Sequence, residues 1–166
     1  MQAKLRIRLV ALLLLGALLA VSCAEERKKQ VKQLATQYLD DEVAGNYHDQ
    51  RNLIDARSAQ VLPLPVGELT NPFSPKRMTA YAFKGIDLTG ATAQATIKAT
   101  FQIQYPGGTT GVPEQYDLTI YVVRQPQEWK VDEIRTRTAA LDKVMGPGLG
   151  STWLMTEKSK RQFSGQ

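Results

Sequence analysis

Apolar and polar residues alternate strictly along one central stretch of the chain. Between Ala91 and Tyr105 every odd position is apolar, whereas threonine, glutamine and lysine fill the even positions. Period-two alternation of this length predicts a long antiparallel strand with one buried and one solvated face. Many of the buried positions are alanine, so we expect a helix to pack close against that face.

A different spacing precedes this strand and is typical of a helix. Its apolar positions follow i, i+3, i+4, i+7 and i+8: Val31, Leu34, Ala35, Tyr38 and Leu39. Gly45 predicts the end of the helix, because glycine adopts a left-handed conformation without a Cβ penalty. Asn46 is then expected to cap a second, shorter helix, with inward side chains at Tyr47, Leu53 and Ile54.

Four prolines interrupt the pattern between Val61 and Arg77. They predict a long loop, because proline removes a backbone donor and restricts the residue before it. The loop is either a crossover from helices to sheet or, as the alternative, a lid or binding segment.

Three further strands surround the central one. Residues 78–88 predict its hairpin partner, turning at Thr89-Gly90, with an ambiguous inward face and a bulge at Gly85. A third strand is expected over 116–122 and a fourth from Trp129 to about Thr136. A helical turn or two over 139–145 and a frayed polar tail complete the prediction.

The first residues have the order of a bacterial signal peptide. Lys4, Arg6 and Arg8 precede an apolar run from Leu9 to Val21. Because a spanning helix needs about 20 apolar residues, the run is too short for a permanent span.

The residues at the end of this run resemble the lipobox of bacterial lipoproteins. Ala20-Val21-Ser22 are small or aliphatic and precede Cys23, the only cysteine of the chain. The resemblance implies cleavage before Cys23 and lipidation (palmitate or a similar acyl chain) of that residue. An unpaired thiol in an exported protein needs an explanation, which lipidation supplies. The alternatives are an ordinary secretory signal beside an incidental cysteine, or an uncleaved anchor.

These patterns divide the chain into four parts. We expect a signal peptide over 1–22, a lipidated tether over 23–30, an α+β domain over 31–138 and a partly flexible extension over 139–166. Without the three basic residues of the signal, 18 basic and 16 acidic residues remain, a net charge of +2. This balance argues against a nucleic-acid partner.

The mature part resembles the NTF2-like (cystatin-like) superfamily. The resemblance rests on the helix 34–39, its continuation into Gly45-Asn46-Tyr47 and the closing segment 128–132. It implies helices packed on a curved four-stranded antiparallel sheet that forms a cone. The proline-rich loop and the tail depart from the family pattern. The fold hosts enzymes, ligand binders and dimerising scaffolds, so it does not decide the function.

The chain offers few candidates for catalysis. The single histidine, His48, excludes a multi-histidine metal site and is expected to be a solvated helix residue. Asp40, Asp41 and Glu42 are consecutive on a helix and diverge, which predicts a solvated face and no paired-carboxylate site. We therefore predict no metal, no cofactor and no catalytic residues.

A binding site remains possible in the cone. Its candidate lining residues are aromatic: Tyr38, Tyr47, Phe101 and Tyr105. On the outer sheet face Thr119, Tyr121 and Val123 predict an apolar strip, which Tyr81 and Phe83 would extend if their strand faces outward. Such a strip is typical of protein contacts and predicts a homodimer through this face.

The function predicted from these residues is a membrane-anchored lipoprotein of the bacterial cell envelope. In a Gram-negative host it is expected at the outer membrane, facing the periplasm. It is expected to act as a non-enzymatic module that binds an envelope protein or a small hydrophobic ligand. Two alternatives are a small cone-pocket enzyme of the isomerase or dehydratase type, and a partner-docking protein that works through Trp153-Leu154-Met155 in its C-terminal tail.

Overall fold

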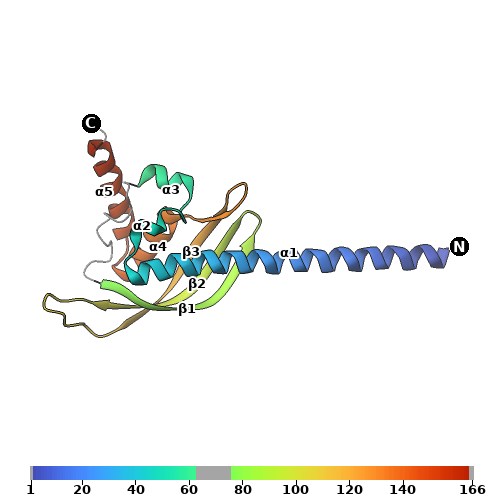
Figure 1. Cartoon of the computed structure of the whole chain (residues 1–166), viewed down its shortest axis with the longest axis horizontal. Coiled ribbons are helices and arrows are strands. Elements are labelled where there is room, and N and C mark those ends of the chain that lie inside the picture. Colours follow the sequence, from blue (N-terminus) through green and yellow to red (C-terminus); the bar gives the residue numbers. More distant parts are fainter. Residues whose placement is uncertain (1, 63–75, 165–166) are drawn as a thin grey trace.

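The chain folds into an α+β arrangement in which helices pack on an open antiparallel sheet (Figure 1). The computed structural model describes residues 2–62 and 76–164, and the side chains of residues 22–62 and 76–159. The helices are α1 (Gln2–Ala44), α2 (Tyr47–Gln50), α3 (Ala56–Val61), α4 (Glu133–Val144) and α5 (Leu149–Ser164). The strands are β1 (Lys76–Thr89), β2 (Thr92–Ile103), β3 (Glu114–Arg124) and β4 (Trp129–Val131). They pair in the order β1-β2-β3-β4. The predicted fold class is confirmed at this level.

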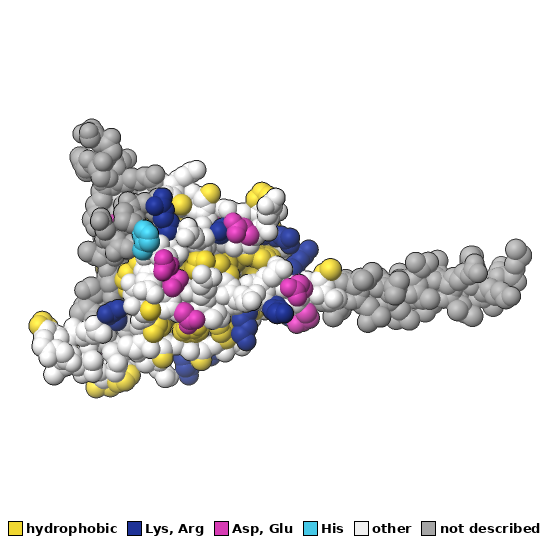
Figure 2. Space-filling model, in the orientation of Figure 1, with side chains coloured by type: hydrophobic (Ala, Val, Ile, Leu, Met, Phe, Trp, Pro, Cys, Tyr) yellow, Lys and Arg dark blue, Asp and Glu magenta, His cyan; other side chains and the backbone are white. Residues whose placement is uncertain are grey.

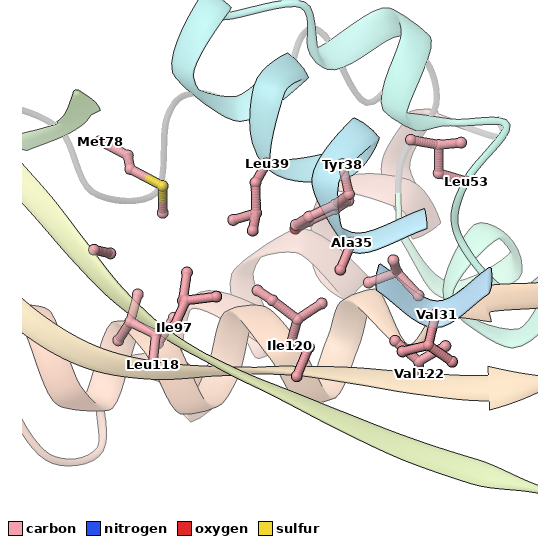
Figure 3. Close-up of a cluster of buried hydrophobic side chains, with 14 of the residues drawn as sticks. Val31, Ala35, Tyr38, Leu39, Leu53, Met78, Ile97, Leu118, Ile120 and Val122 are labelled. Atoms are coloured by element: carbon pink, nitrogen blue, oxygen red, sulfur yellow. The ribbon is translucent and has the colours of Figure 1, made fainter. Parts of the chain in front are cut away.

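Helix α1 supplies the main helical face of the core. The predicted stripe is confirmed, because Val31, Ala35, Tyr38 and Leu39 are buried and point toward the sheet (Figure 3). The helix also runs without interruption through residues 23–30, so the expected tether is helical. It ends where predicted, with Gly45 at a φ of +76°.

The central strand is confirmed as β2. Its alternating side chains are buried on one face, where Ala93, Ala95 and Ala99 belong to the same core cluster as the α1 residues. Ile97 contributes to the same core, together with Ile120 and Val122 of β3 (Figure 3). The alternation of buried and solvated positions predicted from the sequence is thus confirmed.

The structure of strand β1 decides which of its two faces is buried. Its pairing with β2 shifts register between Met78 and Ala80 and again between Phe83 and Gly85. The second shift lies at the predicted bulge. As a result Met78, Tyr81 and Phe83 all pack against the core, and the outward alternative for Tyr81 and Phe83 is wrong.

The segment between α1 and the sheet differs in part from the prediction. Asn46 makes no side-chain capping bond, and α2 is a single turn. The next helix, α3, is capped by Asp55, whose carboxylate accepts from the backbone N–H groups of Arg57 and Ser58 at 2.9 and 3.1 Å. Leu53 and Ile54 are buried, as predicted. Most of the predicted loop lies outside the described residues.

The C-terminal part is more ordered than predicted. The fourth strand ends at Val131 and does not reach Thr136, because the Asp132 side chain accepts from the N–H of Arg135 and caps α4. Helix α4 then packs beside β3: the backbone N–H of Tyr121 donates to Thr136 Oγ1 at 3.0 Å. Gly146-Pro147-Gly148 ends this helix as expected, and the segment predicted to fray is α5. The core therefore continues into the predicted extension.

Candidate functional site

A groove between α1 and β1 is the best candidate for a binding site. It has a volume of about 510 Å³. Lysines from both elements line it, together with two apolar side chains and one carboxylate: Lys28, Lys29, Lys32, Lys84, Phe83, Ile86 and Glu25, beside Gly85. Figure 2 shows Lys and Arg side chains where α1 joins the body of the molecule. The groove begins two residues after Cys23, whose side chain is exposed.

The groove carries an excess of positive charge. Glu25 pairs with Lys28 at 3.3 Å, and Lys84 pairs with Asp117 of β3 at 2.7 Å. The ammonium group of Lys32 lies 5.7 Å from the centre of the Phe83 ring, a cation–π distance. Within the described part of the chain, no carboxylate lies at ion-pair distance from Lys29 or Lys32. These two cations therefore remain available to an anion.

The four predicted lining residues do not surround one cavity. Phe101 is fully buried and packs edge-to-face on Tyr116, with 5.8 Å between ring centres. Tyr105 follows β2 and is 51% exposed. Tyr38 and Tyr47 both lie near Arg137: its guanidinium is 6.0 Å from the Tyr47 ring centre and acts electrostatically on the Tyr38 phenol.

Arg137 is the centre of a buried polar network that the sequence did not predict. Its Nη2 donates to Glu42 Oε2 at 2.8 Å and to Gln50 Oε1 at 3.1 Å, while its Nε donates to Glu133. Gln50 in turn donates to Glu42 Oε2 at 3.1 Å and to the carbonyl oxygen of Tyr38 at 2.9 Å. Glu42 is thus buried and bonded, so the prediction of a solvated face at 40–42 is wrong for this residue.

The electrostatics of this network follow from burial and from its charges. Burial alone would lower the pKa of Arg137, but the carboxylates of Glu133 and Glu42 raise it well above its ordinary value. Burial raises the pKa of Tyr38 well above its ordinary value; Arg137 opposes this shift, while Glu133 and Glu42 add to it. Arg137 therefore stays a cation and Tyr38 a neutral phenol across the physiological range.

The network ties elements together and leaves little room for chemistry. Its members come from α1, α2 and α4 and are excluded from solvent, since Glu133 is 0% exposed. Both carboxylates bond one guanidinium and are buried, which fits a structural role. The interior that a cone-pocket enzyme would use is filled by Phe101, Ile97 and the β2 alanines.

The sequence contained a signal for this network. Glu42 lies four residues after Tyr38, so it continues the apolar stripe of α1. Glu133 and Arg137 likewise lie four residues apart on the face of α4 that buries Ala140 and Leu141. A charged residue at a core position predicts a buried partner of opposite charge.

The outer sheet face is more polar than predicted. With Tyr81 and Phe83 turned inward, the strip is reduced to Thr119, Tyr121 and Val123, all half-buried. The guanidinium of Arg135 lies 3.9 Å from the Tyr121 ring centre and covers part of it.

The remaining candidates are simple to place. His48 is exposed, as predicted. Among the described residues no group of three or more His, Cys, Asp or Glu side chains is arranged to hold a metal ion. None of the helices among these residues combines the length and the apolar character that crossing a membrane requires.

In comparisons with known proteins, no protein-family model and no curated protein matches this chain.

Proposed function

We propose that this chain is a lipoprotein of the bacterial cell envelope, held at a membrane by lipid on Cys23, and that it acts there as a non-enzymatic binding module. The observation that carries the proposal is the lysine-lined groove between α1 and β1, which begins within one helical turn of Cys23. A ligand bound in this groove lies beside the anchor. The engaged carboxylates around Arg137 and the filled interior of the fold favour binding over catalysis.

The finer fold assignment is part of the same proposal. Helix α1 crosses the buried face of an antiparallel sheet, and Gly45-Asn46-Tyr47 leads from it into the single turn of α2. These features support an NTF2-like (cystatin-like) domain. Besides the proline-rich loop and the tail, the early start of α4 directly after β4 departs from the predicted final strand.

The anchor is tested by the mass of the N-terminal peptide of the full chain expressed in a bacterium. We expect this peptide to start at Cys23 and to carry two or three acyl chains, because one chain alone binds a membrane only marginally. In Cys23→Ser the modified peptide is expected to be absent. In the control Ser22→Ala, which keeps a small residue before the cysteine, it is expected to persist. An unmodified Cys23 in the wild-type chain would overturn the proposal.

A further inference from the structure

The ligand of the groove can be inferred from its charge, its apolar floor and its distance from Cys23. Four lysines and one glutamate line the groove, and Lys29 and Lys32 have no carboxylate partner among the described residues. An excess of ammonium groups favours an anion with several acceptor oxygens, such as a phosphate diester. Phe83 and Ile86 add apolar surface next to these cations. The combination suits an amphiphile that has an anionic head and an apolar body.

The position of the groove near Cys23 indicates that this amphiphile comes from the membrane. Helix α1 is continuous from Cys23 to Lys32, and an α-helix rises 1.5 Å per residue. Lys28, Lys29 and Lys32 therefore lie about 8 to 14 Å from Cys23 along the helix axis. The polar layer on each side of a bilayer is about 5 to 8 Å thick, so with the acyl chains on Cys23 embedded an upright helix places Lys28 at the outer edge of this layer and Lys29 and Lys32 beyond it. Their long side chains, or a tilt of the helix toward the surface, bring the ammonium groups to the headgroups. A membrane surface that contains anionic lipid attracts clustered lysines at this depth.

We propose that the groove between α1 and β1 binds the phosphate headgroup of an anionic phospholipid in the membrane that holds the Cys23 anchor. This proposal rests on the proposed function above and adds a second, non-covalent attachment. Lys29 and Lys32 contact the phosphate, Lys84 approaches it from β1, and Phe83 and Ile86 form the apolar floor of the groove beside the headgroup. Two attachment points hold the domain in one orientation, which a single lipid anchor does not.

The test uses the full chain, purified in detergent and incorporated into nanodiscs of phosphatidylcholine with or without phosphatidylglycerol. Native mass spectrometry after release counts the phosphatidylglycerol molecules that the protein retains. We expect one retained molecule in the wild-type chain. Because each surface lysine contributes roughly a fivefold factor to the attraction for anionic lipid, the double variant Lys29→Gln/Lys32→Gln is expected to bind about 25-fold more weakly.

The matched control is Lys143→Gln/Lys158→Gln, which removes the same charge from exposed positions on α4 and α5. Binding is expected to persist in this control. If both double variants lost phosphatidylglycerol binding equally, only the net charge would matter and the proposal would be overturned. Phosphatidylglycerol retained by both double variants would overturn it as well.

Two further readouts separate the possible causes of failure. The intact mass of each sample reports the acyl chains on Cys23, so a missing anchor is distinguished from a missing headgroup site. Inorganic phosphate is added as a competitor and is expected not to displace the lipid. If inorganic phosphate alone binds the groove and displaces the lipid, the groove is a soluble-anion site and the lipid proposal is wrong.

Discussion

Arg137 connects three helices through side chains that solvent does not reach. Its guanidinium is bonded to Glu42, Glu133 and Gln50. We expect Arg137→Gln to lower the free energy of unfolding by about 3 to 5 kcal/mol, because the substitution leaves two buried carboxylates without a cation. Urea denaturation measures this change. The control is Arg57→Gln on the exposed side of α3, where a loss within about 1 kcal/mol is expected. A similarly small loss at Arg137 would contradict a structural role for the network.

Because Tyr38 is buried, the free energy of unfolding depends on pH in the alkaline range. Its pKa is raised in the folded chain, chiefly by burial, above the ordinary value of about 10. The neutral phenol is therefore favoured in the folded state, and its stabilisation is fully present below about pH 10 and is lost as the pH rises through the folded pKa.

We thus expect the free energy of unfolding to fall above about pH 10, and to fall less steeply in Tyr38→Phe. Tyr81, whose pKa burial and Asp40 raise to about 12, contributes to the remaining slope. Denaturant titrations at several alkaline pH values provide the measurement. Tyr105→Phe, at an exposed position, should keep the wild-type slope; identical slopes in both variants would contradict the assignment to Tyr38.

At the level of elements, the contact between α4 and α5 depends on one glycine. A Cβ at Gly150 would lie 2.2 Å from the carbonyl oxygen of Thr138 and 2.7 Å from its Cα, so the backbones of the two helices would have to separate. Gly150→Ala is expected to lower the free energy of unfolding by about 1 to 3 kcal/mol. It is also expected to change the fluorescence of Trp153, which packs against the core. At Gly85 a Cβ meets no atom within 4 Å, so Gly85→Ala serves as the control. Unfolding curves of the two variants that coincide would show that α4 and α5 separate without cost.

The elements also show which parts of the fold a sequence can predict. Period-two and helical spacing predicted β2, the C-terminal part of α1 and the hairpin turn, because in these segments one face is apolar and the other polar. The first part of helix α4, before the predicted turns at 139–145, was missed because its buried face contains Glu133, Thr136 and Arg137, so its periodicity is not apolar. The inward face of β1 was ambiguous for another reason: the register shift between Met78 and Ala80 places Met78 and Tyr81 on the same side despite their odd separation.

The candidate site was harder to predict than the fold. Lys28, Lys29 and Lys32 are recognisable as one helical face from their i, i+3 and i, i+4 spacing. Their partners Phe83 and Lys84 are more than fifty residues away in the chain, and only the packing of α1 on β1 brings them into one groove. Long-range packing of this kind has no local signal in a single sequence.

For the whole molecule, the homodimer stays a prediction. It now rests on Thr119, Tyr121 and Val123 of β3, and Arg135 already covers part of the Tyr121 ring. Sedimentation velocity of the full chain in detergent is expected to show a dimer that weakens in Thr119→Lys, because a charge would enter the contact. The control Gln60→Lys places the same charge on α3 and is expected to have no effect. A wild-type protein that sediments as a monomer would contradict this prediction.

The short fourth strand has a consequence for contacts between copies of the chain. Unpaired strand edges are templates for aggregation between copies. Here residues 53–55 cover β4: Val131 N–H donates to the Leu53 carbonyl and Asp55 N–H to the Val131 carbonyl, both at 2.8 Å. Further along β3, the carbonyl oxygen of Tyr121 accepts from the N–H of Asp132 at 2.8 Å. At the opposite side of the sheet, the register shifts make β1 irregular. Copies of the domain are thereby protected against edge-to-edge polymerisation.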